Sequence, residues 1–160
     1  MNTKNYKLLF GALVLMVFTT FTSCDEVDDI DVGGTSVEDM SGDWYLEFNG
    51  SYYLMTTYNT AADNGQEMWI DDNQNFWWFK AKCPVNTTSL TFAGSDLPSS
   101  YDGYDITVTI TNGKIEKGTA VTSGGNKSDA ISFDIEFSDD PGTIYSLAGY
   151  KRTGFAEDEH

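Results

Sequence analysis

Histidine is almost absent from this chain of 160 residues. Its one histidine, His160, is the last residue. We expect His160 to be mobile, as chain ends generally are. No interior histidine is therefore available as the general base of a serine or cysteine nucleophile, or as a metal ligand. A Gly-x-Ser-x-Gly elbow is also missing. These absences predict that the protein holds no metal and no cofactor, and they leave only carboxylates for hydrolytic chemistry.

Basic side chains are scarce as well. Nine lysines and arginines stand against 25 aspartates and glutamates, which gives a formal net charge of −16. Nucleic-acid binding depends on neutralising phosphates with lysine and arginine, so it is excluded. Among so many acids, no pair can be singled out as the two carboxylates, about 5 to 9.5 Å apart, of a glycoside hydrolase. A hydrolase that uses carboxylates on a lipid or glycan stays open as an alternative.

The N-terminal residues have the pattern of an export signal. Lys4 and Lys7 precede an apolar run over 8–18. This run is too short to cross ~30 Å of hydrocarbon, which needs about 20 helical residues, but it suits the apolar part of a secretory signal. Thr22-Ser23-Cys24 resembles the end of a bacterial lipobox. The resemblance implies that residues 1–23 are removed and that Cys24 carries lipid as the new first residue.

Only two cysteines are present, Cys24 and Cys83. If Cys24 is acylated, no intramolecular disulfide and no cysteine-based zinc site can form. Cys83 is then expected to be a small buried apolar residue.

An acidic segment, 25–31, follows the lipobox, and 24–40 as a whole is predicted to be a flexible linker. The segment resembles the export tag of surface lipoproteins in Bacteroidota. The resemblance implies an outer-membrane lipoprotein exposed on the cell surface, and an orientation toward the periplasm is the alternative.

Residues 41–155 lack apolar spacing typical of helices and instead alternate apolar and polar positions. The alternation over 76–81 predicts a strand with Trp77 and Phe79 on one face. Asn112-Gly113 predicts a tight hairpin turn between strands at 104–111 and 114–119. We expect an all-β, antiparallel, up-and-down barrel of about eight strands, followed by an acidic tail at 156–160.

Two separated features resemble the signature of lipocalins and related calycins. Gly42-Asp43-Trp44 opens the first predicted strand, and Arg152 follows the last one. The resemblance implies that Trp44 closes one end of an eight-stranded barrel and that Arg152 lies across its ring. The alternative is an ordinary core tryptophan and an ordinary surface arginine.

A second resemblance covers most of the domain. It is carried, in order, by the segments 69–72 (WIDD), 75–77 (NFW), 137–143 (FSDDPGT), 151–155 (KRTGF) and 157–159 (EDE). They resemble a Bacteroides lipoprotein family that is described as lipid-binding putative hydrolases. The resemblance implies a lipid-anchored, lipocalin-like barrel, and no catalytic residue can be transferred from it.

Aromatic side chains favour a binding function over catalysis. We expect a lipid or another small hydrophobic or amphipathic ligand inside the barrel. The candidate lining residues are Tyr53, Met55, Met68, Trp77 and Phe79. Two alternatives remain: a barrel filled by its own side chains, and a non-catalytic surface module that contacts glycans or partner proteins through exposed aromatics.

Overall fold

The structure is a computed structural model that describes residues 33–160. The predicted signal, the predicted lipidation site Cys24 and the acidic segment that follows it lie outside the described residues. Residues 34–160 form one compact unit that contains every strand and its own core. Within residues 33–160, no helix has the length and apolar composition that crossing a membrane requires.

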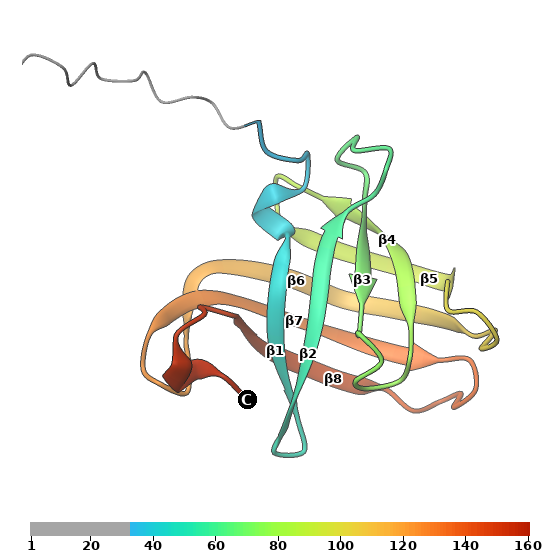
Figure 1. Ribbon diagram of the computed structural model, residues 1–160. Helices are drawn as coiled ribbons and strands as arrows, with labels where there is room; N and C mark the ends of the chain where they lie inside the picture. Colours follow the sequence, from blue (N-terminus) through green and yellow to red (C-terminus); the bar gives the residue numbers. More distant parts are fainter. Residues whose placement is uncertain (1–32) are drawn as a thin grey trace, which may run out of the picture. The chain divides into compact units, whose positions relative to one another are not determined.

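The described residues form a closed barrel of eight antiparallel strands, in which each strand pairs with the next and β8 pairs with β1 (Figure 1). This confirms the predicted fold class. Short 3₁₀ helices, η1 (Glu38–Met40) and η2 (Ala156–Asp158), lie before and after it. The strands are β1 (Gly42–Phe48), β2 (Ser51–Asn59), β3 (Glu67–Asp71), β4 (Lys80–Asn86), β5 (Thr91–Pro98), β6 (Thr107–Val121), β7 (Lys127–Phe137) and β8 (Tyr145–Lys151).

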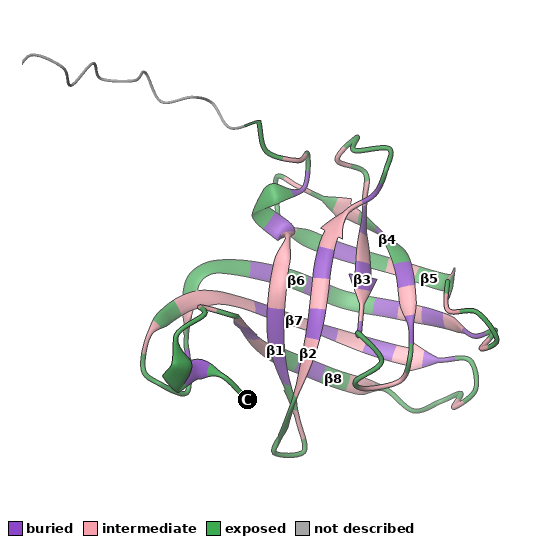
Figure 2. Cartoon of the chain, in the orientation of Figure 1, coloured by how far each residue is buried: buried purple, intermediate pink, exposed green. Residues whose placement is uncertain are grey.

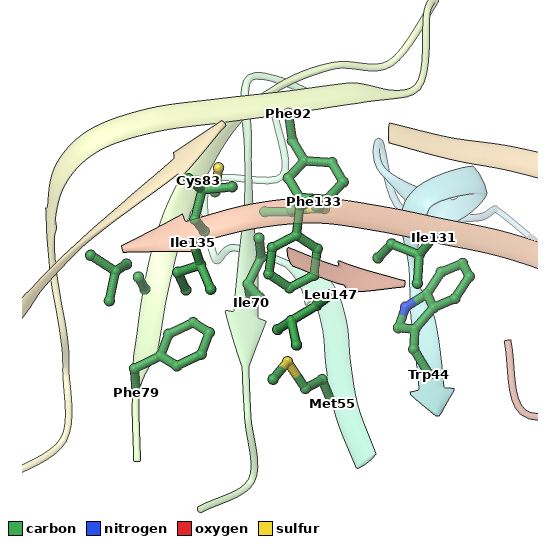
Figure 3. Close-up of a cluster of buried hydrophobic side chains, with 14 of the residues drawn as sticks. Trp44, Met55, Ile70, Phe79, Cys83, Phe92, Ile131, Phe133, Ile135 and Leu147 are labelled. Carbon is green, nitrogen blue, oxygen red and sulfur yellow. The ribbon is translucent and has the colours of Figure 1, made fainter. Parts of the chain in front are cut away.

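Strict alternation builds the core, as β7 shows. Ile131, Phe133, Ile135 and Phe137 are buried, whereas the residues between them are only half-buried. The other strands also carry buried residues, mostly separated by intermediate or exposed ones (Figure 2). Side chains from opposite strands therefore point into one shared space and fill it, as Figure 3 shows.

The core also includes residues that precede the first strand. Val37, which precedes η1, and Met40, the last residue of η1, are 1% and 0% exposed. The folded part of the chain therefore begins before Ser41, inside the segment that the sequence suggested was a linker.

The turn predicted at Asn112-Gly113 is wrong, because β6 runs through both residues as one strand. Thr111 pairs with Asp134 and Lys114 with Ser132, so β6 has one extra residue here, which is a β-bulge. The bulge moves the inward-facing phase of β6 from even to odd positions. Gly113 suits the bulge because a Cβ there would lie 2.3 Å from the carbonyl oxygen of Phe92.

The up-and-down topology collects the loops at two ends. We call the end formed by the loops 49–50, 72–79, 99–106 and 138–144 the mouth. The opposite end carries η1, the remaining three connections and the chain's last residues.

Candidate functional site

A buried carboxylate organises one loop of the mouth, 72–79. Asp72 is 0% exposed. Its two oxygens accept hydrogen bonds from five backbone N–H groups of its own loop: Gln74 (2.9 Å), Phe76 (3.3 Å), Trp77 (2.7 Å), Trp78 (2.6 Å) and Phe79 (3.1 Å). Because a carboxylate accepts several such bonds at once, one side chain fixes the path of the whole loop.

This loop corrects the strand predicted over 76–81, since β4 begins only at Lys80. Turning successive N–H groups toward one carboxylate is incompatible with extended backbone, and Trp78 has a left-handed φ of 60°. Trp77 and Phe79 therefore do not share a strand face. Phe79 packs in the core, whereas Trp77 is half-buried at the mouth.

Aromatic rings close the mouth from within. Phe76 is central to them: its ring centroid lies 5.1 Å from that of Tyr53, 5.5 Å from that of Phe48 and 5.7 Å from that of Tyr145. Trp77 stacks on Phe137 with centroids 4.5 Å apart and planes 8° from parallel. These contacts hold the loop rigidly over the packed core.

Outside these rings lies an open cleft of about 480 Å³, which we call the mouth cleft. Its lining residues are Phe76, Trp77, Trp78, Gly103 and Tyr104. The indole of Trp78 is 58% exposed.

One carboxylate joins the two loops that line the mouth cleft. The Trp77 indole N–H donates a hydrogen bond of 3.1 Å to Asp139, and the Tyr104 hydroxyl donates a second one to the same carboxylate. The hydrogen bond from Tyr104, together with that from Trp77, holds the pKa of Asp139 below its usual value, although partial burial acts to raise it. Asp139 is therefore an anion at neutral pH, fixed beside aromatic rings.

The five predicted lining residues fall into two groups. Met55, Met68 and Phe79 are at most 1% exposed and belong to the packed core. Tyr53 and Trp77 are half-buried and lie among the rings of the mouth. The structure therefore brings only the second group to an accessible surface.

At the opposite end, Trp44 is fully buried. Its indole N–H donates a 2.8 Å hydrogen bond to the hydroxyl of Thr57, which in turn donates one of 2.6 Å to the carbonyl of Met40. This chain of hydrogen bonds ties β1 and β2 to η1.

The expected position of Arg152 across the ring of Trp44 is wrong. Register pairs Trp44 with Lys151, whose Nζ lies 5.8 Å from the indole centroid. Arg152 points to the outer side, where its Nε and Nη2 form a bidentate ion pair with Glu159 at 2.8 and 2.7 Å. Gly42 leaves space for the Lys151 stem, since a Cβ at Gly42 would lie 2.5 Å from Cε of Lys151.

The model of a family described as "Lipid-binding putative hydrolase" matches residues 29–156. The chain belongs to this family. No curated protein matches the chain.

The two buried carboxylates among the described residues lie at opposite ends of the barrel and do not form a catalytic pair. Asp72 lies at the mouth, and Asp158, also 0% exposed, lies against the β6–β7 turn at the opposite end. Burial acts to raise the pKa of Asp158, but hydrogen bonds from Thr122, Thr153 and Asn126 outweigh burial and lower it to about 2. Asp72 and Asp158 each accept hydrogen bonds from backbone N–H groups of the fold, so both have a structural role.

The expected mobility of His160 is also wrong, because its ring is docked on the barrel. The imidazole stacks on Tyr52 with centroids 3.7 Å apart, and Nε2 lies 2.5 Å from the Tyr150 hydroxyl and 3.4 Å from that of Ser123. Among the described residues, no carboxylate hydrogen-bonds this imidazole, so a Ser-His-Asp arrangement is not assembled.

The prediction for Cys83 is confirmed. Its side chain is 0% exposed, and burial raises the pKa of the thiol to about 12. It is therefore protonated at neutral pH and a poor nucleophile.

Sequence reasoning missed three residues of the mouth: Asp72, Tyr104 and Asp139. A usable signal was present for Asp72, because an Asp at the start of a loop often accepts N–H groups of the residues that follow it. The bonds of Tyr104 and Trp77 to Asp139 span 35 and 62 positions, so no local pattern could reveal them.

Proposed function

We propose that this protein is a lipid-anchored component of the cell envelope that binds an amphipathic, lipid-like molecule at the mouth of its barrel. The observation that carries the proposal is the mouth cleft: a preformed aromatic surface stays open, with Trp78 more than half exposed, although the barrel beneath it is packed. Large exposed aromatics on a rigid scaffold commonly mark a binding surface.

The mouth cleft has the two kinds of surface that an amphiphile needs. Trp77 and Trp78 offer apolar indole surface, while the Tyr104 hydroxyl and the Asp139 carboxylate supply polar groups beside it. The Asp72 hydrogen bonds and the stacking of Trp77 on Phe137 order these side chains before any ligand arrives. Such preorganisation lowers the entropy cost of binding.

A larger groove is less suited to a lipid. It has a volume of about 590 Å³ and lies over β4, β5 and the bulge of β6. Its exposed side chains include Asn86, Thr91, Asn112 and Lys114, and its one aromatic ring, Phe92, is 3% exposed. This groove offers many hydrogen-bonding groups, and it has no exposed aromatic ring on which an apolar chain could lie.

The anchor in the proposal is supported by the basic start, the apolar run at 8–18 and the lipobox-like Thr22-Ser23-Cys24. We expect the protein purified from its own envelope to begin at Cys24 and to carry the mass of attached acyl chains. Mass spectrometry of the intact protein measures both features. An unmodified chain that still contains residues 1–23 would contradict the anchor.

The binding prediction concerns Trp78. In residues 34–160, Trp78→Ala is expected to weaken the binding of dodecyl maltoside, a neutral amphiphile kept below its micelle concentration, by about tenfold, because it removes the most exposed apolar surface of the cleft. Isothermal titration calorimetry measures the dissociation constant.

Trp69→Ala is the matched control, because it removes an indole from the outer face of β3. Trp69 packs between Lys80 and Lys82, whose Nζ atoms lie 5.1 and 5.2 Å from its ring, away from the mouth cleft. We expect this variant to bind like the unchanged protein. Equal weakening by both substitutions, or no binding by the unchanged protein, would refute the assignment of the cleft.

A further inference from the structure

The mouth carries charge of only one sign. Its four loops contain no lysine or arginine, but they contain five aspartates: Asp72, Asp102, Asp105, Asp139 and Asp140. Asp72 is enclosed by its own loop, and the other four lie on the two loops 99–106 and 138–144. Asp102 and Asp105 flank the lining residues Gly103 and Tyr104 in the chain, and Asp139 accepts hydrogen bonds from the lining residues Trp77 and Tyr104. The nearest lysine along the chain, Lys80, is held 3.6 Å from Asp71.

The aromatic rings of the cleft add to this negative potential. Trp77, Trp78 and Tyr104 all line it, and the electron-rich faces of indole and phenol rings attract cations. Asp139 is fixed to two of these rings, the indole of Trp77 and the phenol of Tyr104. A group placed on the rings therefore meets a fixed carboxylate at the same place.

We infer that the mouth cleft selects amphiphiles whose polar end is a cationic ammonium group, and that it rejects those ending in carboxylate, sulfate or phosphate. This inference rests on the proposed function and names the ligand class of the same site. An ammonium head gains from the ring faces and from Asp139 together, whereas an anionic head meets four aspartates and no counter-charge. An apolar chain attached to either head lies on the indole of Trp78.

The test compares three amphiphiles with the same twelve-carbon chain on residues 34–160: dodecyltrimethylammonium, dodecyl maltoside and dodecyl sulfate, each below its micelle concentration. We expect the ammonium compound to bind about tenfold more tightly than the maltoside, and the sulfate to bind at least tenfold more weakly than the maltoside. Calorimetry measures all three dissociation constants.

Two charge-matched variants separate the cleft from the general acidity of the protein. Asp139→Asn removes the charge and keeps one oxygen, which can accept the hydrogen bond of the Trp77 indole while the NH₂ group faces the Tyr104 hydroxyl. We expect it to weaken ammonium binding about tenfold, which is more than it weakens maltoside binding. Glu38→Gln removes one exposed charge at the opposite end and should leave both unchanged.

The outcomes distinguish the inference from the proposed function. Equal affinities for the ammonium and maltoside compounds, or equal weakening by Asp139→Asn and Glu38→Gln, would overturn the selectivity and leave the lipid-binding site in place. Absence of binding by all three amphiphiles would overturn both.

Discussion

Replacing Asp72 with alanine is expected to lower the free energy of unfolding by about 3–5 kcal/mol, a large effect for one side chain in a loop. Five backbone N–H groups lose their acceptor together, and the carboxylate that held them was fully buried. Each buried donor left without a partner costs about 1–3 kcal/mol, which relaxation of the loop into water partly offsets. Urea unfolding followed by circular dichroism measures the difference.

Asp72→Asn is a sharper version of the same experiment. Asparagine keeps one oxygen but turns an NH₂ group toward N–H donors, so we expect roughly half of the loss caused by alanine. Asp102→Ala, in an exposed position of a neighbouring mouth loop, is the control and should change stability by no more than about 0.5 kcal/mol. An Asp72→Ala protein as stable as the Asp102→Ala protein would show that the loop does not depend on its carboxylate.

The barrel could be predicted from the sequence because its determinants are local. Alternation such as Ile131, Phe133, Ile135 and Phe137 requires one buried face, and a series of such strands with short turns requires a closed sheet. The same rule fails where the chain leaves the extended conformation. The aromatic sequence at 76–79 is compatible with a strand and with a loop. The hydrogen bonds that Asp72 accepts from this segment favour the loop.

Three further predictions are wrong because the local sequence is compatible with two structures, and contacts between strands or with distant residues determine which one forms. Asn112-Gly113 is equally compatible with a hairpin turn and with a bulge. The bulge forms because β5 and β7 continue to pair with β6 on both sides of it. Lys151 and Arg152 are neighbours of the same charge, and the pairing of β8 with β1 alone decides which of them reaches Trp44. The docking of His160 likewise depends on tyrosines more than 100 positions away.

Trp44→Ala is the second substitution with a large expected effect, about 3–5 kcal/mol of lost stability. The ring is 0% exposed, so its removal leaves a cavity among the side chains labelled near it in Figure 3. The substitution also breaks the 2.8 Å hydrogen bond to Thr57 and so loosens the link from the barrel to η1. Thermal unfolding of residues 34–160 followed by circular dichroism measures the loss.

The same measurement on two other variants shows which part of the lipocalin-like signature stabilises the fold. Arg152→Ala should change stability far less than Trp44→Ala, since Arg152 forms a solvent-exposed ion pair with Glu159. Trp78→Ala should be nearly neutral, because its ring is mostly in solvent. If Trp78→Ala weakens binding but not stability, and Trp44→Ala does the reverse, the two ends of the barrel have separate roles. A loss from Trp78→Ala as large as that from Trp44→Ala would instead make the mouth part of the structural core.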